Sequence, residues 1–137
     1  MRKYLFLIVL TLFLSACSNN EVSEKEVNTD QEVTEKIEYI KISSEEAKEM
    51  MSDDVLILDV RSQEEFDEGH IEGAVLLPVD EILAGNYGPL TDLDQTILVY
   101  CRSGNRSAKA AKALIKVNYS KVYDFGGIFD WPYGIVK

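Results

Sequence analysis

Histidine and cysteine are scarce in this chain of 137 residues, which contains one histidine and two cysteines. No Cys/His cluster has the spacing of a zinc site, so we expect no metal. A C-x-x-C pair is also missing, which disfavours a thioredoxin-like oxidoreductase. If Cys17 is lipidated, as argued below, Cys101 is the only free thiol and no internal disulfide can form.

A hydrophobic run long enough to cross a bilayer is missing too. The apolar stretch at residues 5–14 has ten residues, which is too few for a spanning helix. Arg2 and Lys3 precede it, and basic residues followed by a short apolar run are typical of a secretory signal peptide. We therefore predict a signal peptide at residues 1–16.

The apolar stretch ends in Leu14-Ser15-Ala16-Cys17, which resembles the lipobox of bacterial lipoproteins. The resemblance implies that Cys17 is diacylated and becomes the first mature residue. Two acyl chains hold a protein on a membrane without a spanning helix, so we predict an extracytoplasmic protein anchored to the bacterial cell membrane. The alternative is an ordinary secretory signal with an incidental cysteine.

Aromatic residues, glycine and proline are absent from residues 18–36, which contain six acidic residues and three scattered valines. Such a segment cannot bury enough apolar surface to offset the entropy of ordering. We predict that residues 17–36 comprise the lipidated cysteine and a flexible acidic tether. The rest, residues 37–137, has the size and apolar content of one domain.

The charge is acidic overall, at −10, but unevenly distributed. This balance argues against nucleic acid as a partner. No Asp or Glu occurs between residues 95 and 123, and a cleft in this basic stretch would concentrate small anions. The alternative is that the lysines belong to a solvated helix face and have no function, but this explains the two loop arginines less well. The basic residues are Arg102, Arg106, Lys109, Lys112, Lys116 and Lys121.

Apolar runs and helical patterns alternate along residues 37–137, which predicts an α/β domain with a mainly parallel central sheet. Ligands of such sheets bind at the carboxyl ends of the strands, and Cys101 follows a strand directly. Ser43 with Glu46, and Ser62 with Glu65, form capping boxes. We expect strands near 37–42, 55–58, 74–77, 96–100 and 121–123, helices at 43–51, 62–69, 80–83 and 107–117, and a sharp turn at 126–127.

The segment around Cys101 has the composition of a thiolate site that faces an anion. A thiolate can be stabilised by the amides at a helix N-terminus, and a helix is expected to follow directly. Gly104 allows the chain to turn with positive φ, while Arg102 and Arg106 offer charge and paired donors to an oxyanion. The alternative is a small buried cysteine with no chemistry.

Four ordered motifs, at residues 58–61, 66–74, 100–107 and 126–131, resemble those of single-domain rhodanese-like sulfurtransferases. The resemblance implies a small domain with a five-stranded, mostly parallel sheet flanked by helices. It also implies that Cys101 takes a sulfane sulfur from a small anionic donor such as thiosulfate. The resulting persulfide would pass its sulfur to cyanide or a thiol, and no other cofactor is needed. The residues implied to bind the substrate are Arg102, Ser103, Gly104, Asn105 and Arg106.

Three further residues of the motifs, Asp59, Arg61 and His70, are interpreted as structural residues near the site. Two other functions remain open. One is a non-catalytic module that carries a persulfide or senses redox state. The other is a cysteine phosphatase, although its Cys-x5-Arg loop would be one residue longer than the segment from Cys101 to Arg106.

Overall fold

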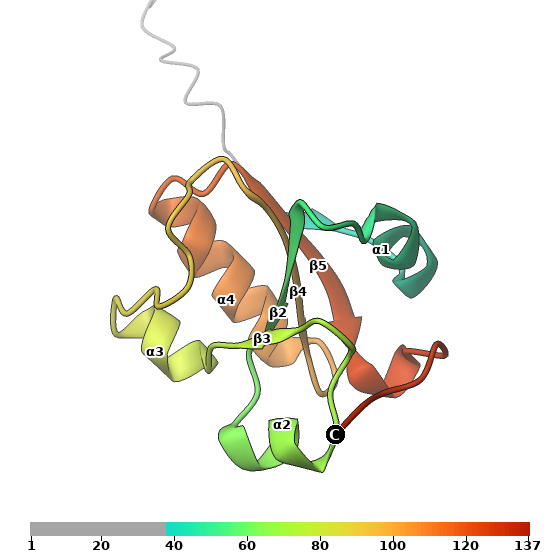
Figure 1. Cartoon of the computed structure of the whole chain (residues 1–137). Coiled ribbons are helices and arrows are strands. Elements are labelled where there is room, and N and C mark those ends of the chain that lie inside the picture. The colour runs from blue at the N-terminus through green and yellow to red at the C-terminus, as the bar shows by residue number, and fades with distance from the viewer. Residues whose placement is uncertain (1–37) are drawn as a thin grey trace, which may run out of the picture. The chain divides into compact units, whose positions relative to one another are not determined.

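The structure is a computed structural model that describes residues 38–137 (Figure 1). The predicted signal peptide, the lipidated Cys17 and the tether lie outside these residues. Within residues 38–137, no helix is long and apolar enough to cross a membrane. The strands are β1 (Ile40–Lys41), β2 (Val55–Asp59), β3 (Val75–Leu76), β4 (Thr96–Cys101) and β5 (Lys121–Gly127); the helices are α1 (Ser44–Met50), α2 (Gln63–Glu68), α3 (Val79–Leu83) and α4 (Asn105–Lys116), with a 3-10 turn, η1, at Ile128–Asp130.

The five strands form one sheet in the order β1-β5-β4-β2-β3, and every pairing in it is parallel. The predicted five-stranded α/β fold is therefore confirmed. β4 lies at the centre of the sheet because it is continuously apolar, as expected of a strand that is buried on both faces. The carboxyl ends of β2, β4 and β5 meet at one edge, and Cys101 is the last residue of β4.

Two apolar layers cover the two faces of the sheet. Alternate residues of β4 divide between them: Val99 and Cys101 pack in the layer that contains α4 residues, and Leu98 and Tyr100 pack in the other. Figure 1 shows α3 and α4 on one side of the sheet and α1 on the other. The sulfur of Cys101 is thus on the side of the sheet that α4 covers.

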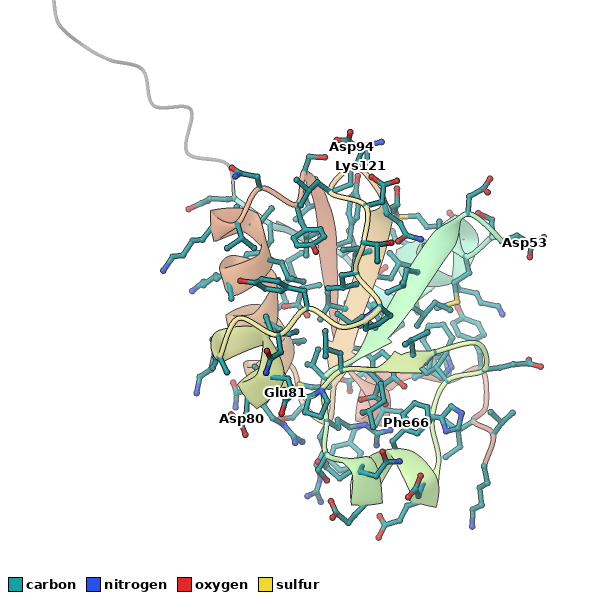
Figure 2. The ribbon with its side chains drawn as sticks, turned by 60° about the vertical axis from the view of Figure 1, so that its left-hand side comes forward. Asp53, Phe66, Asp80, Glu81, Asp94 and Lys121 are labelled. Atoms are coloured by element: carbon teal, nitrogen blue, oxygen red, sulfur yellow. The ribbon has the colours of Figure 1, made fainter. Side chains whose placement is uncertain are left out.

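Both predicted capping boxes are present and start α1 and α2 as expected. Figure 2 labels Phe66 of α2 at one end of the sheet, and Asp94 and Lys121 at the opposite end, where β4 and β5 begin. α2 therefore lies near the carboxyl ends of the strands, beside the loop that follows Cys101.

Two of the differences from the predicted boundaries concern the site. α4 begins at Asn105 instead of Ser107, because Gly104 adopts a left-handed conformation with φ of 98° and lets the helix start at once. β5 continues to Gly127, so residues 126–127 end a strand where a turn was expected. A register shift between Val99 and Cys101 pairs Cys101 with Gly127 and allows this extension.

Candidate active site

Cys101 lies beneath the short loop that joins β4 to α4, with 1% of its surface exposed. The Gly104 amide donates a hydrogen bond to Sγ at 3.1 Å, and Ser107 Oγ lies 3.7 Å from Sγ. Only residues 102–104 separate the strand from the helix, so the first turn of α4 faces the sulfur. The positive end of the helix therefore points at the atom that becomes negative.

The environment of the thiol favours the thiolate. Burial raises the pKa of Cys101, but hydrogen bonding to the amide and hydroxyl of Ser107 lowers it more, together with the amides of Ser103 and Gly104. The net pKa is below the ordinary value of a thiol. These donors belong to the loop and the helix start, so the thiol is activated without a histidine base.

β5 forms the other wall of the loop through backbone contact. A Cβ atom at Gly127 would lie 2.6 Å from Ser103 Cα and closer still to the carbonyl oxygen of Arg102. Gly127 has an extended backbone, with φ of −123°, so the approach of the loop and not its own φ requires glycine here. The neighbouring Gly126 does have positive φ, at 89°, and its carbonyl accepts a hydrogen bond from Ser107 Oγ.

Arg106 forms an ion pair with Glu65 of α2. Its two terminal nitrogens donate to the two carboxylate oxygens of Glu65 at 2.6 and 2.8 Å. The hydrogen bond from Arg106 is the main reason that the pKa of Glu65 falls to about 2. Glu65 Oε2 also accepts from the Ser62 amide, so one carboxylate caps α2 and holds the arginine of α4.

Arg102 has a different environment from Arg106. It is exposed, and its guanidinium lies 5.0 Å from the ring centre of Phe129, which is itself 69% exposed. A cation over an aromatic face is attracted by the ring but keeps its charge. The two arginines of the loop sequence are therefore not equivalent: within residues 38–137, Arg106 is paired with a carboxylate and Arg102 is not.

Asp59 and Arg61 form a buried ion pair at the end of β2. Arg61 Nη2 lies 2.7 Å from Asp59 Oδ2 and donates a second hydrogen bond, of 2.8 Å, to the Gly69 carbonyl. Asp59 also accepts a hydrogen bond from the Tyr100 hydroxyl. Burial raises the pKa of Tyr100 most, and this hydrogen bond raises it further. The Asp59–Arg61 pair therefore connects the end of β2 to β4 and to the loop after α2.

His70 lies after α2 and contacts neither the sulfur nor the loop in any interaction of the described residues. Its ring stacks on Phe66 with a centroid distance of 3.7 Å, and Nδ1 is 3.0 Å from the Phe66 carbonyl oxygen. Its backbone pairs with Val136 in both directions. These contacts are those of a structural histidine.

The other implied substrate-binding residues are placed as follows. Ser103 and Asn105 are exposed, and Gly104 is half-buried. Ser103 offers its amide to the sulfur, while Asn105 begins α4. No hydrogen bond of the Asn105 side chain is found among residues 38–137.

Three functional candidates were missed by sequence reasoning. Ser107 was identified only as a motif residue and the helix start, Glu65 only as a capping residue, and Phe129 only as a member of the motif at residues 126–131. The capping box was a visible signal for Glu65, but nothing in it indicates a partner that lies 41 residues away. Ser107 was missed because the helix starts two residues earlier than predicted, which turns its hydroxyl inward.

Two hollows open beside α2, and the smaller borders the Cys101 loop through Arg102. The smaller, of about 170 Å³, has Arg102 and Phe129 in its wall together with residues of α2. The larger, of about 380 Å³, continues over Trp131 and Ile135. Both combine charged and apolar side chains, and Glu65 and Phe129 line both.

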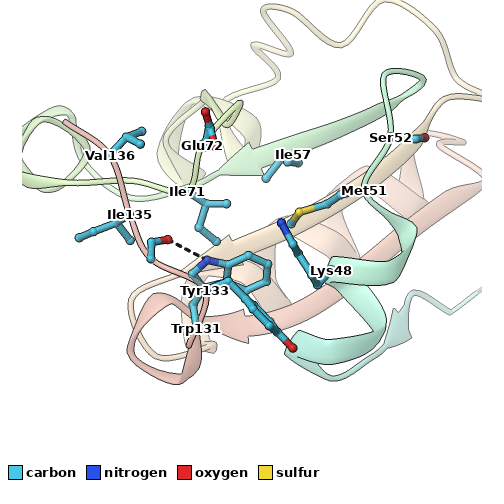
Figure 3. A pocket seen from close by; sticks show the side chains of 11 residues that line it. Lys48, Met51, Ser52, Ile57, Ile71, Glu72, Trp131, Tyr133, Ile135 and Val136 are labelled. Atoms are coloured by element: carbon cyan, nitrogen blue, oxygen red, sulfur yellow. Dashed lines mark hydrogen bonds between the residues drawn. The ribbon is translucent and has the colours of Figure 1, made fainter.

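A third hollow, of about 360 Å³, lies between α1 and the C-terminal segment (Figure 3). Lys48 and Tyr133 face one another across it, and Trp131 Nε1 donates to the Gly134 carbonyl at 3.0 Å. None of its lining residues belongs to the Cys101 loop. Of the three hollows, the smallest has a residue of this loop, Arg102, in its lining.

Comparison with known protein families gives two matches. Residues 43–132 match the family described as "Rhodanese-like domain". Residues 1–18 match "Prokaryotic membrane lipoprotein lipid attachment site", which agrees with the lipobox at residues 14–17. The first match covers nearly all of the described domain, and the second covers the predicted signal peptide together with Cys17.

Individual proteins agree with the first match. "Thiosulfate sulfurtransferase GlpE" of Pseudomonas fluorescens is 32% identical over 93 residues, which is 68% of this chain and 84% of that protein. "Thiosulfate sulfurtransferase PspE" of Escherichia coli is 32% identical over 73 residues, which is 53% of this chain and 70% of that protein. The chain spans only 32% of a "Probable molybdopterin-synthase adenylyltransferase" of Porphyra purpurea, at 29% identity.

Solved structures are similar as well. A rhodanese-related protein from Thermoplasma volcanium has a TM-score of 0.63 at 29% identity, covering 72% of this chain and 98% of that one. A structure titled "rhodanese with anions from E. coli" has a TM-score of 0.55 at 30% identity, covering 60% of this chain and 96% of that one.

Proposed function

Because this chain belongs to the rhodanese-like domain family, we propose that it is a sulfurtransferase that carries sulfane sulfur as a persulfide on Cys101. The proposal rests on the environment of the Cys101 thiol. It ends the central strand, its pKa is lowered, and amides of the loop and of α4 converge on it. The relatives named thiosulfate sulfurtransferases support thiosulfate as a donor.

The first half-reaction is a substitution at sulfur. The Cys101 thiolate attacks the outer sulfur of thiosulfate, the S–S bond of the donor breaks, and sulfite leaves with the bonding electron pair. The outer sulfur of the new persulfide is anionic, and the amides of Ser103, Gly104 and Ser107 that stabilise the thiolate can stabilise it as well. No external oxidant or reductant is needed, because the sulfur moves without net electron transfer.

The second half-reaction returns the thiolate. Cyanide or a thiolate attacks the outer sulfur of the Cys101 persulfide, giving thiocyanate or a new persulfide, and the Cys101 sulfur takes back the electron pair. The chain has no second cysteine in the domain that could resolve the persulfide. The acceptor must therefore come from outside the domain.

The match to a lipid attachment site at residues 1–18 supports a location at a membrane for this chemistry. We propose that Cys17 is lipidated and that the domain works outside the cytoplasm, held to the bacterial membrane through residues 17–36. Metabolic labelling with a fatty acid tests this step: wild type is labelled, and Cys17→Ser is not. Labelling of the Cys17→Ser protein would overturn the anchor.

Sulfur transfer from thiosulfate to cyanide tests the catalytic proposal. Wild type is expected to form thiocyanate, while Cys101→Ala loses activity and keeps its circular dichroism and melting temperature. Mass spectrometry of thiosulfate-treated protein should show the addition of one sulfur atom at Cys101. Failure to add this sulfur would contradict the proposal. Addition of the sulfur without transfer to cyanide would favour the non-catalytic module that carries a persulfide. Hydrolysis of an aryl phosphate at a comparable rate would favour the phosphatase.

A further inference from the structure

We propose that Glu65 sets the charge selectivity of the Cys101 site: by neutralising Arg106, it makes the site favour monoanionic organic sulfane-sulfur donors over the thiosulfate dianion. The proposal rests on the sulfurtransferase function and adds to it a residue that determines donor specificity. Glu65 would act through Arg106, and no contact between Glu65 and the donor is required.

The ion pair occupies one edge of the Arg106 guanidinium. Both terminal nitrogens are bound to the Glu65 carboxylate, so the edge that they form is not available to bind an oxyanion with two hydrogen bonds. The Ser62 amide also donates to the carboxylate and helps to fix it. The pKa of Glu65 is about 2, so the carboxylate is charged at every pH at which a thiolate can act.

The charges beside the loop are balanced. The smaller hollow is lined by two arginines, Arg61 and Arg102, and by two carboxylates of α2, Glu65 and Glu68. Arg106, which pairs with Glu65, and Asp59, which pairs with Arg61, lie outside this lining and carry opposite charges. The charges of the lining therefore sum to zero, and the sequence expectation of a basic cleft does not describe this hollow.

The four lysines of residues 95–123 do not line this hollow. Three of them, Lys109, Lys112 and Lys116, line a separate groove between α3 and α4, together with Leu83 and other residues. Figure 2 shows Lys121 at the opposite end of the sheet from α2. Charges outside the hollow are screened over a Debye length of about 8 Å at physiological ionic strength.

The same hollows have an apolar wall. Ile128 and the exposed ring of Phe129 line the smaller one, and Trp131 and Ile135 extend the surface in the larger one. Thiosulfate has no apolar group that could contact these side chains. An organic group in place of one thiosulfate oxygen both removes a negative charge and provides such a group.

Methanethiosulfonate is a matched probe, because a methyl group replaces one O⁻ of thiosulfate and the transferred sulfur is the same. The Cys101 thiolate attacks its outer sulfur, the S–S bond breaks, and methanesulfinate leaves with the electron pair. We would measure kcat/KM for both donors with cyanide as acceptor, in wild type, Glu65→Gln and Glu64→Gln. The amide oxygen of Gln at 65 can still accept from Ser62, and Glu64→Gln makes the same change of net charge on the same helix.

We expect Glu65→Gln to lower KM for thiosulfate by about fivefold or more, since one charge next to a dianion changes by a full unit. KM for methanethiosulfonate should change by a smaller factor, so the preference shifts towards thiosulfate. Glu64→Gln should leave the ratio of the two kcat/KM values unchanged. A merely structural Glu65 would lower both activities together without improving KM.

The salt dependence of wild type provides a second measurement that needs no variant. A site with balanced charge predicts a weak dependence of kcat/KM for thiosulfate on ionic strength, and a steep fall with added salt would overturn the proposal. An unchanged donor ratio in folded Glu65→Gln would overturn it too. If wild type transfers sulfur from neither donor, the sulfurtransferase proposal itself fails, which is a distinct result.

Discussion

Replacement of Gly127 by alanine tests the contact between β5 and the Cys101 loop most directly. Gly127 has an extended backbone, so alanine causes no strain in φ. The added Cβ would lie 2.6 Å from Ser103 Cα and 2.7 Å from the carbonyl carbon of Arg102, with the Arg102 oxygen nearer still. All three are backbone atoms, so no side-chain rotation can relieve the clash.

The magnitude follows from these distances. Overpacking in a well-packed region costs about 1–3 kcal/mol and more where atoms cannot move, so we expect about 3 kcal/mol of lost stability. For a domain of this size, that corresponds to a fall in melting temperature of roughly 12 °C or more. The loop should also move away from β5, which weakens the amide hydrogen bonds to Cys101 and lowers its thiolate fraction.

Denaturant unfolding and the rate of iodoacetamide alkylation at pH 7 measure the two effects. Gly85→Ala is the control, because φ there is 87° and no atom lies within 4 Å of the added Cβ. It should show only the cost of a left-handed backbone, about 1–2 kcal/mol, with normal alkylation of Cys101. If Gly127→Ala matched wild type in stability and alkylation rate, the described approach of the loop to β5 would be wrong.

Three other predictions concern the residues around the thiol. Ser107→Ala should raise the pKa of Cys101, because it removes a hydroxyl that lowers this pKa, and the pH profile of alkylation should shift upward; an unmoved profile would contradict the assigned contact. Asp59→Asn should lose about 3–5 kcal/mol of stability in denaturant unfolding, because it leaves the buried Arg61 charge without its partner; a loss below 1 kcal/mol would be incompatible with burial of the pair. Because the pKa of Glu65 falls from 4.5 to about 2 on folding, its contribution to stability is complete above pH 4.5 and is lost as the pH falls towards 2, so Glu65→Gln should flatten the acid limb of a stability–pH curve.

Local patterns in the sequence were sufficient for most of the fold. The capping boxes placed the starts of α1 and α2, because a cap depends on residues three positions apart. Continuous apolar runs placed β2 and β4, because a strand buried on both faces has no polar side. The alternation of strands and helices predicted that the strands run parallel, but it did not predict their order in the sheet.

The ends of β5 and the start of α4 could not be predicted in the same way. β5 extends to Gly127 because a register shift brings it against Cys101, a contact that depends on the neighbouring strand. α4 starts at Asn105 because Gly104 takes positive φ under the packing of the loop. For β5, the deciding contact is distant in the sequence.

For the site, the sequence by itself determined which atom reacts: a lone cysteine at a strand end, before a glycine and a helix start. Only the tertiary structure decided the charge around it. Two arginines next to a cysteine predict an anion site, but α2 folds beside α4 and brings Glu65 to Arg106. Charge acts through space, so the potential at the sulfur depends on residues that the local sequence does not contain.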